Sequence, residues 1–242
     1  MSELKVKKPS KIDELKAMSP KDRNRAIGDL LMNNAMFIII AFAVVGIAIA
    51  EPTFLSIPSI VNIISLTAAK LPIALGVGGC IILAGTDISA GRQVGLAAAI
   101  SAGLQLTTNK LFPGLQVMPI PVAVIAVLAV GCVIGFVNGF CMARFKLHPF
   151  IVTLSTQLIV YGLVLMFMQL GTNSGQTLSG MAPEYREFVT GTLFKVGKTA
   201  VPNYVLYSAI IAVVVWIIWN KTAFGKNMYA VGSNEEAANV SG

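Results

Sequence analysis

Six apolar runs, separated by polar segments, dominate the pattern of hydrophobic and polar positions in this chain. They cover residues 30–50, 60–84, 94–106, 119–143, 151–170 and 204–219. A helix rises about 1.5 Å per residue, so about 20 apolar residues cross the hydrocarbon core of a bilayer. Most of the runs approach this length, and the third run is short. The pattern therefore predicts an all-α fold, a polytopic transmembrane helix bundle with about six or more spans, some of them broken or short.

The second run has a polar interruption near its middle, at Lys70 and Pro72. A lysine at the centre of a span costs on the order of 2.5 to 3.5 kcal/mol on insertion scales, and an internal proline removes a helical hydrogen bond. A continuous helix that faces lipid is therefore disfavoured here. We expect either a segment that is broken at residues 70–72 and faces protein, or two short helices that meet at Lys70.

The composition supports lipid as the solvent, because 55% of the residues are hydrophobic and only 12% are charged. The net charge is +7, and eight of the 18 lysines and arginines precede residue 26. Cytoplasmic segments of membrane proteins carry such an excess. We therefore expect a cytoplasmic N-terminal tail over residues 1–33, a transmembrane domain over 34–219 and a cytoplasmic segment over 220–242. Within the tail, Ser10 with Asp13, and Ser19 with Pro20 and Asp22, have the pattern of helix starts.

Nucleic-acid binding and enzyme chemistry find little support in the pattern. The basic tail lacks aromatic residues for base stacking, and acidic residues interrupt it. Residues 224–227 lack the upstream glycine and the hydroxyl residue of a phosphate-binding loop. The single histidine, His148, precedes a proline, and the three cysteines, Cys80, Cys132 and Cys141, lack metal-ligand spacing. We therefore expect no catalytic residue, no metal and no cofactor in this chain.

The densest polar segment between two apolar runs is the sequence GTDISAGRQ over residues 85–93. Its side chains could line a substrate pathway through the membrane, because polar groups inside spans often mark such pathways. The candidate pathway residues are Thr86, Asp87, Ser89, Arg92 and Gln93, together with Lys70. The alternative interpretation is structural, because Thr, Asp and Ser are also the residue types that cap a helix. The sequence leaves both interpretations open.

Glycines at helical spacing indicate two faces for close helix packing. Gly91 and Gly95 lie four residues apart, and so do Gly131, Gly135 and Gly139. Small residues at this spacing allow another backbone to approach closely. We expect both groups to lie at helix–helix contacts.

The last ten residues, SNEEAANVSG, predict a short helix in the cytoplasmic segment. Ser233 and Glu236 have the spacing of a capping box, Glu235 suits the N-terminus of a helix, and Gly242 could end it. Such a helix is either a solvated tail or a docking element. Capping chemistry does not distinguish the two.

Four segments of the chain, in the right order, resemble the integral membrane permeases of bacterial ABC importers. Residues 236–238 followed by Gly242 match the opening of the EAA signature of that family, and residues 85–91 are similar to the GTDLS-type signature of its monosaccharide branch. Residues 85–96, 148–154 and 220–227 are most similar to the galactose and methyl-galactoside members of that branch. The resemblance covers nearly the whole chain from Glu51 onward.

This resemblance implies a transport subunit rather than an enzyme, with several spans in the bacterial inner membrane. In this family the EAA loop forms a coupling helix that enters a cleft of a separate ATPase subunit, and that subunit binds the ATP. The coupling residues of this chain would be Glu235, Glu236, Ala237, Ala238 and Gly242. The other implied partners are an extracytoplasmic sugar-binding protein and a second permease copy, and the implied cargo is a galactose-like monosaccharide.

Members of this family continue beyond the glycine of the EAA signature, so we expect this chain to be a partial permease with half of its coupling element. A non-transporting remnant is therefore one alternative function. An ion-coupled carrier or channel is another, because such proteins also use membrane charges such as Lys70 and Asp87.

Overall fold

The computed structural model describes residues 19–108, 110–171 and 175–241. In the described residues the chain is mostly helical, and its elements are α2 (Pro20–Asn33), α3 (Ala35–Ala50), η1 (Pro52–Leu55), α4 (Ile57–Ile82), α5 (Ala90–Gln105), α6 (Ile120–Phe145), α7 (Pro149–Met168), α8 (Pro183–Thr190), β1 (Thr192–Val196), β2 (Thr199–Pro202), α9 (Asn203–Lys221), α10 (Ala223–Ser233) and α11 (Glu235–Ser241). The chain divides into two compact units, Met1–Ile60 and Val61–Gly242.

The first unit contains the helices α2 and α3. Helix α2 begins where the sequence predicts, because the Ser19 hydroxyl oxygen accepts the backbone N–H of Asp22 at 3.3 Å. The apolar run 30–50, which was expected to form one crossing, belongs to two helices that are bent by 70° around Asn34. The Asn34 side-chain amide donates to the Leu30 carbonyl at 2.8 Å and so competes with the helical bonding at this point. The other predicted helix start, at Ser10 and Asp13, lies outside the described residues.

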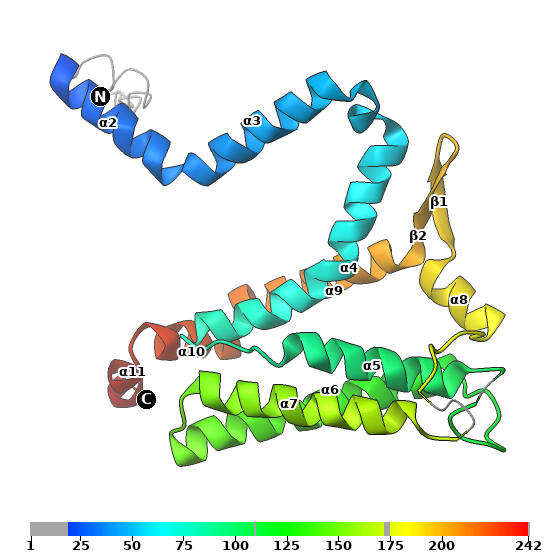
Figure 1. The fold of residues 1–242 in the computed structure, drawn as a ribbon. Coiled ribbons are helices and arrows are strands. Elements are labelled where there is room, and N and C mark those ends of the chain that lie inside the picture. Colours follow the sequence, from blue (N-terminus) through cyan, green and yellow to red (C-terminus); the bar gives the residue numbers. More distant parts are fainter. Residues whose placement is uncertain (1–18, 109, 172–174, 242) are drawn as a thin grey trace, which may run out of the picture. The chain divides into compact units, whose positions relative to one another are not determined.

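Helix α4 runs without interruption through Lys70 and Pro72, so the predicted break is wrong. The helix instead changes direction part-way along its length (Figure 1). Proline lacks the N–H for one helical bond and its ring presses on the preceding turn, which bends a helix that packing holds intact. Lys70 is exposed, whereas the buried residues of α4 are Val61, Ser65 and Ala68.

The helices of the second unit run back and forth between two ends (Figure 1). At one end, Gly85 after α4 lies against Pro149 at the start of α7, and α10 packs on the last turn of α4. We call this the Asp87 end, comprising residues 82–92, 144–153 and 218–233. At the opposite end, the Thr107 N–H donates to the Gly180 carbonyl at 3.0 Å. We call this the Tyr185 end, comprising residues 104–108, 110–119 and 178–202.

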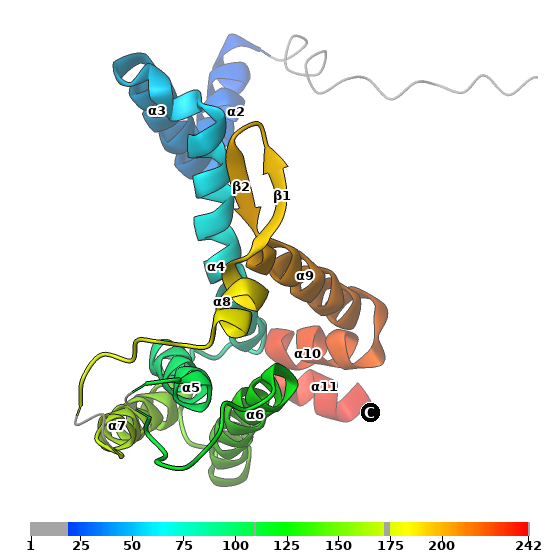
Figure 2. The same ribbon diagram turned by 90° about the vertical axis from the view of Figure 1, so that its right-hand side faces the viewer.

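The polar stretch between α7 and α9 contains elements that the sequence analysis did not predict, namely α8 and the antiparallel hairpin β1–β2. Figure 2 shows α8 between α5 and the hairpin. The Asn203 side chain donates to the Glu187 carbonyl at 3.0 Å, and the Tyr207 hydroxyl donates to the Phe188 carbonyl at 3.0 Å. These bonds hold α8 on the start of α9, so α8 and the hairpin cover the Tyr185 end.

Four described helices, α4, α6, α7 and α9, are long and apolar enough to cross a membrane, and the bent pair α2–α3 could be a fifth. Helix α5 has only 16 residues, as expected for a short span. The predicted polytopic helical fold is therefore confirmed, whereas the number of six or more spans is not.

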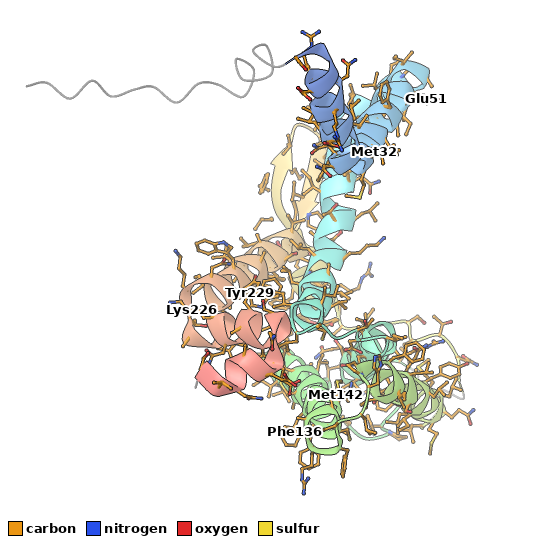
Figure 3. The ribbon with its side chains drawn as sticks, turned by 90° about the vertical axis from the view of Figure 1, so that its left-hand side faces the viewer. Met32, Glu51, Phe136, Met142, Lys226 and Tyr229 are labelled. Carbon is orange, nitrogen blue, oxygen red and sulfur yellow. The ribbon has the colours of Figure 1, made fainter. Side chains whose placement is uncertain are left out.

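The outward faces of these helices are strongly apolar. Phe136 on α6 and Met166 on α7 are each 72% exposed in the isolated chain. Figure 3 shows the Phe136 side chain pointing away from the neighbouring helices. Apolar faces of this extent are stable against lipid or another protein rather than against water.

Candidate functional site

A group of hydrogen-bonded polar side chains joins α5, α6 and α7 near the Asp87 end. The group, which we call the polar cluster, consists of Asp87, Ser89, Gln93, Asn138, Thr153 and Thr156. These residues come from three helices and the loop before α5. Because apolar surroundings offer no water to an unpaired polar group, such a cluster strongly constrains how the helices pack.

Ser89 is the centre of the polar cluster, and its exposed fraction is 0%. Its hydroxyl donates to Asp87 Oδ1 at 2.6 Å and accepts from Gln93 Nε2 at 2.7 Å. The Nδ2 of Asn138 lies 3.4 Å from the same hydroxyl oxygen and donates to it. One buried hydroxyl therefore connects the loop, α5 and α6.

Two threonines extend the polar cluster to α7. The Thr156 hydroxyl donates to Asn138 Oδ1 at 2.6 Å. The Thr153 hydroxyl, which is also fully buried, lies 2.9 Å from the Pro149 carbonyl and 3.3 Å from the Thr86 carbonyl. Through these contacts the first turns of α7 hold the backbone of the loop that carries Asp87.

Asp87 holds the loop before α5 in a local side-chain turn. Its Oδ1 accepts the backbone N–H of Ser89 at 2.8 Å, in addition to the Ser89 hydroxyl. Ser89 itself makes no side-chain cap bond to α5. The loop is tight, because Ala84 adopts the left-handed region with φ 56°. No side-chain bond caps α5, so the structure shows Asp87 fixing the loop within a buried network, and both interpretations of the segment stay predictions.

The structure does not bring all predicted pathway residues together. Lys70 and Arg92 are exposed and lie outside the polar cluster. The Arg92 guanidinium instead stands over the Tyr161 ring of α7, 4.4 Å from its centroid, which is a cation–π contact. Thr86 takes part through its carbonyl only. A role of any of these side chains in a substrate pathway stays a prediction.

Asn138, Thr153 and Thr156 are members of the polar cluster that the sequence analysis missed. A signal was present, since Asn138 is the one amide side chain within the apolar run 119–143. An isolated amide inside a span needs a partner, which is a reason to single it out. Its partners could not be deduced, because they lie 18 and 49 residues away in the sequence.

The glycines of the two predicted packing faces do not contact another helix in the described residues. A Cβ placed on Gly91, Gly95, Gly131, Gly135 or Gly139 has no neighbouring atom of the described residues within 4 Å. Their role in helix packing therefore stays a prediction that involves a surface other than those the structure describes. Close backbone approaches lie elsewhere, at Gly225 and Gly232 of α10, where a Cβ would overlap carbonyl groups of Trp219 and Ile82.

Helix α11 confirms the predicted short helix, but the predicted cap is wrong. Helix α10 continues through Ser233, and Asn234 is the capping residue of α11 because its Oδ1 accepts the Ala237 N–H at 2.9 Å. Ser233 is itself helical and cannot take the extended conformation of a cap, which Asn234 adopts with φ −162°. Glu235 and Glu236 lie in the first turn, where they suit the helix dipole. Gly242 lies outside the described residues.

Comparison with known proteins identifies the family. Residues 59–242 match a family described as branched-chain amino acid transport system / permease component. The chain belongs to this permease family. The galactose/methyl galactoside import permease protein of Haemophilus influenzae is 43% identical to it over 229 residues, which are 93% of this chain and 67% of that protein. The protein of the same name from Escherichia coli is 40% identical over 88% of this chain and 63% of its own length.

A ribose import permease protein of Haemophilus influenzae is more distant, at 29% identity over 93% of this chain and 65% of that protein. This permease chain thus spans about two thirds of the length of these relatives. No solved structure matches it. The region matched to the permease family includes the polar cluster, α10 and α11.

Proposed function

We propose that this chain is the membrane permease subunit of an ATP-driven importer of a monosaccharide, of the galactose or methyl galactoside type. The observation that carries the proposal is 40–43% identity to import permeases of that name over most of the chain. The family description names a different cargo, branched-chain amino acids, so family membership alone does not select the substrate. The lower identity of 28–30% to ribose import permeases favours a galactose-like sugar.

The Asp87 end and the N-terminal tail would face the cytoplasm of a bacterial cell with the chain in its inner membrane. The basic residues near the Asp87 end are Arg92, Arg144, Lys146, Lys221 and Lys226, and those near the Tyr185 end are Lys110, Arg186, Lys195 and Lys198. If the tail and the Asp87 end lie on the same side of the membrane, the eight basic residues of the tail add to the first group. Positive charge accumulates on the cytoplasmic side of membrane proteins, which supports this orientation. It requires that the α2–α3 pair and the short α5 each cross once.

In this orientation α11 is the element that reaches the ATPase subunit, which binds and hydrolyses ATP. Its first turn carries Glu235, Glu236, Ala237 and Ala238, all at the surface or half-buried in the isolated chain. The Tyr185 end would face the sugar-binding protein that delivers substrate. A second permease copy would complete the pathway, covering apolar helix faces such as that of Phe136. Closure of the ATPase on ATP would then switch the permease between outward-facing and inward-facing states.

The polar cluster would hold the helices that line the pathway in place. Not all of its residues would contact the sugar. Ser89 is fully buried, so it acts through its neighbours in this conformation. Lys70, Thr86 and Arg92 are exposed, and they are the predicted pathway residues best placed to reach solvent or substrate. Cargo of this kind is rich in hydroxyl groups, which hydrogen-bond to such side chains.

Replacement of Glu236 by alanine tests the proposal. We expect co-purification of the ATPase with the permease to fall by roughly tenfold or more, because an interface core residue often dominates binding. The amount of permease in the membrane should not change. Glu184→Ala, an exposed carboxylate at the Tyr185 end, is the matched control and should leave ATPase binding unaltered.

Two results would contradict the proposal. Normal co-purification of the ATPase with the Glu236→Ala variant would remove the docking role of α11. Sugar uptake that survives ATP depletion but collapses with the ion gradient would favour the ion-coupled carrier. Substrate-stimulated ATP turnover by this chain with its partners would exclude the non-transporting remnant.

A further inference from the structure

Helix α10 packs between the ends of α4 and α9 through a single face (Figures 1 and 2). This face contains Gly225, Met228 and Gly232, whose spacing of three and four residues places them on one side of a helix. Gly225 and Met228 are buried, whereas Lys226 and Tyr229 on other sides of α10 are exposed (Figure 3). Helix α10 is therefore an integral part of the second unit and not a solvated linker.

At both ends of α10 a glycine allows the backbone of this helix to contact the backbone of α9 or α4 directly. A Cβ at Gly225 would overlap the Trp219 carbonyl, and a Cβ at Gly232 would overlap the Ile82 carbonyl. Between them, a Cβ added at Gly79 of α4 would lie 3.7 Å from the methyl carbon of Met228. A contact of backbone on backbone contains no flexible side chain that could absorb a displacement. Movement of α10 must therefore displace the end of α4.

The end of α4 leads directly into the polar cluster. Ile82 is the last residue of α4, Ala84 has the left-handed φ of 56°, and the Gly85 N–H donates to the Cys80 carbonyl at 2.9 Å. The following carbonyl, of Thr86, accepts from Thr153, and Asp87 bonds to Ser89. Gly85, Thr86 and Asp87 of this short loop are thus each held by a hydrogen bond, so a shift of Ile82 is passed to α5 and α7.

The connection from α10 to α11 is equally short. Asn234 is the only residue between them, its N–H donates to the Ala230 carbonyl of α10 at 3.1 Å, and its carbonyl accepts the Ala238 N–H of α11 at 3.0 Å. Its side chain also caps α11. The two helices therefore share one hydrogen-bonded residue and have no flexible segment between them.

We propose that Gly232 is a positioning residue for transport, and that its contact with Ile82 transmits the movement of α11 to the loop of Asp87. Helix α10 acts as the rigid arm that joins the two. This inference rests on the proposed function, because it takes α11 as the element that the ATPase moves. It differs from that function in naming the route by which the movement reaches the spans.

Substitution Gly232→Ala in the transporter assembled from permease, ATPase and sugar-binding protein tests the inference. The added methyl group separates α10 from α4, so we expect sugar uptake per ATP hydrolysed to fall by roughly tenfold, with ATPase binding unchanged. Gly76→Ala is the matched control, since this glycine of α4 has no neighbouring atom of the described residues within 4 Å. The control should keep the uptake-to-hydrolysis ratio of the unmodified protein.

A second variant, Asn234→Gly, adds no atoms to the packed region and loosens the joint between α10 and α11. It should lower the ratio of sugar uptake to ATP hydrolysis while the ATPase still co-purifies with the permease. If the Gly232→Ala variant fails to assemble, this second variant alone tests the inference. An unchanged ratio in Asn234→Gly, or in an assembled Gly232→Ala transporter, would overturn the inference. Failure of the unmodified chain to bind the ATPase would instead overturn the proposed function.

Discussion

Replacing Ser89 by alanine is expected to lower the free energy of unfolding of the permease by about 2 kcal/mol. The Ser89 hydroxyl is the common partner of Asp87, Gln93 and Asn138, and it is fully buried. Its removal leaves two amide donors and one carboxyl oxygen each with one bond fewer. The measurement is the change in thermal unfolding of the purified protein in detergent.

Ser155→Ala is the matched control for this experiment. Ser155 lies on α7 and is exposed, and its hydroxyl bonds only to the Ile151 carbonyl of its own helix at 2.9 Å. Its loss should change the stability by less than about 0.5 kcal/mol, as is usual for surface substitutions. If Ser89→Ala were no more destabilising than Ser155→Ala, the polar cluster would not be what holds α5, α6 and α7 together.

Exchange of Asp87 for alanine is expected to reduce sugar uptake by roughly tenfold or more and to destabilise the protein by about 2 kcal/mol. The carboxyl oxygen that receives both the N–H and the hydroxyl of Ser89 is then absent. Asp87→Asn keeps an oxygen at this position, so it should retain both stability and uptake. The two variants are compared by uptake into proteoliposomes that contain the assembled transporter and by thermal unfolding.

The outcome of this pair separates the two interpretations of the segment 85–93. Retention of uptake in Asp87→Asn supports a role of Asp87 in holding the loop. A normally stable Asp87→Asn variant that has lost uptake would contradict our expectation, because the charge itself would then act on the substrate or on a gate.

The spans could be predicted from the sequence to within a few residues. The run 119–143 became α6 (Ile120–Phe145), and the run 151–170 became α7 (Pro149–Met168). The bilayer imposes both a length and an apolar composition on a span, so the signal is local and strong. Helix α8 and the hairpin β1–β2 escaped prediction because they are short and polar, and contacts such as Tyr207 with Phe188 hold them in place.

Two local predictions failed, the break at Pro72 and the cap at Ser233. The break expected at Pro72 is absent, because α4 is one continuous helix that changes direction part-way along its length (Figure 1). At Ser233 the expected cap became the last residue of α10, because Gly232 seats that helix on Ile82 and the next residue, Asn234, takes the cap. The contact of Gly232 with Ile82 joins residues that are 150 positions apart in the sequence.

By itself the sequence determined that the chain is a helical membrane protein, where most spans lie, and that residues 85–93 and 233–242 are candidate functional segments. These properties follow from composition, apolar run length and short motifs, which act over a few turns of helix. Only the tertiary structure decided that Ser89 meets Asn138, that Thr153 holds the Thr86 carbonyl, and that α10 rests on the end of α4. Such contacts join segments 49 to 150 residues apart, and no local pattern specifies which buried donors and acceptors will satisfy one another.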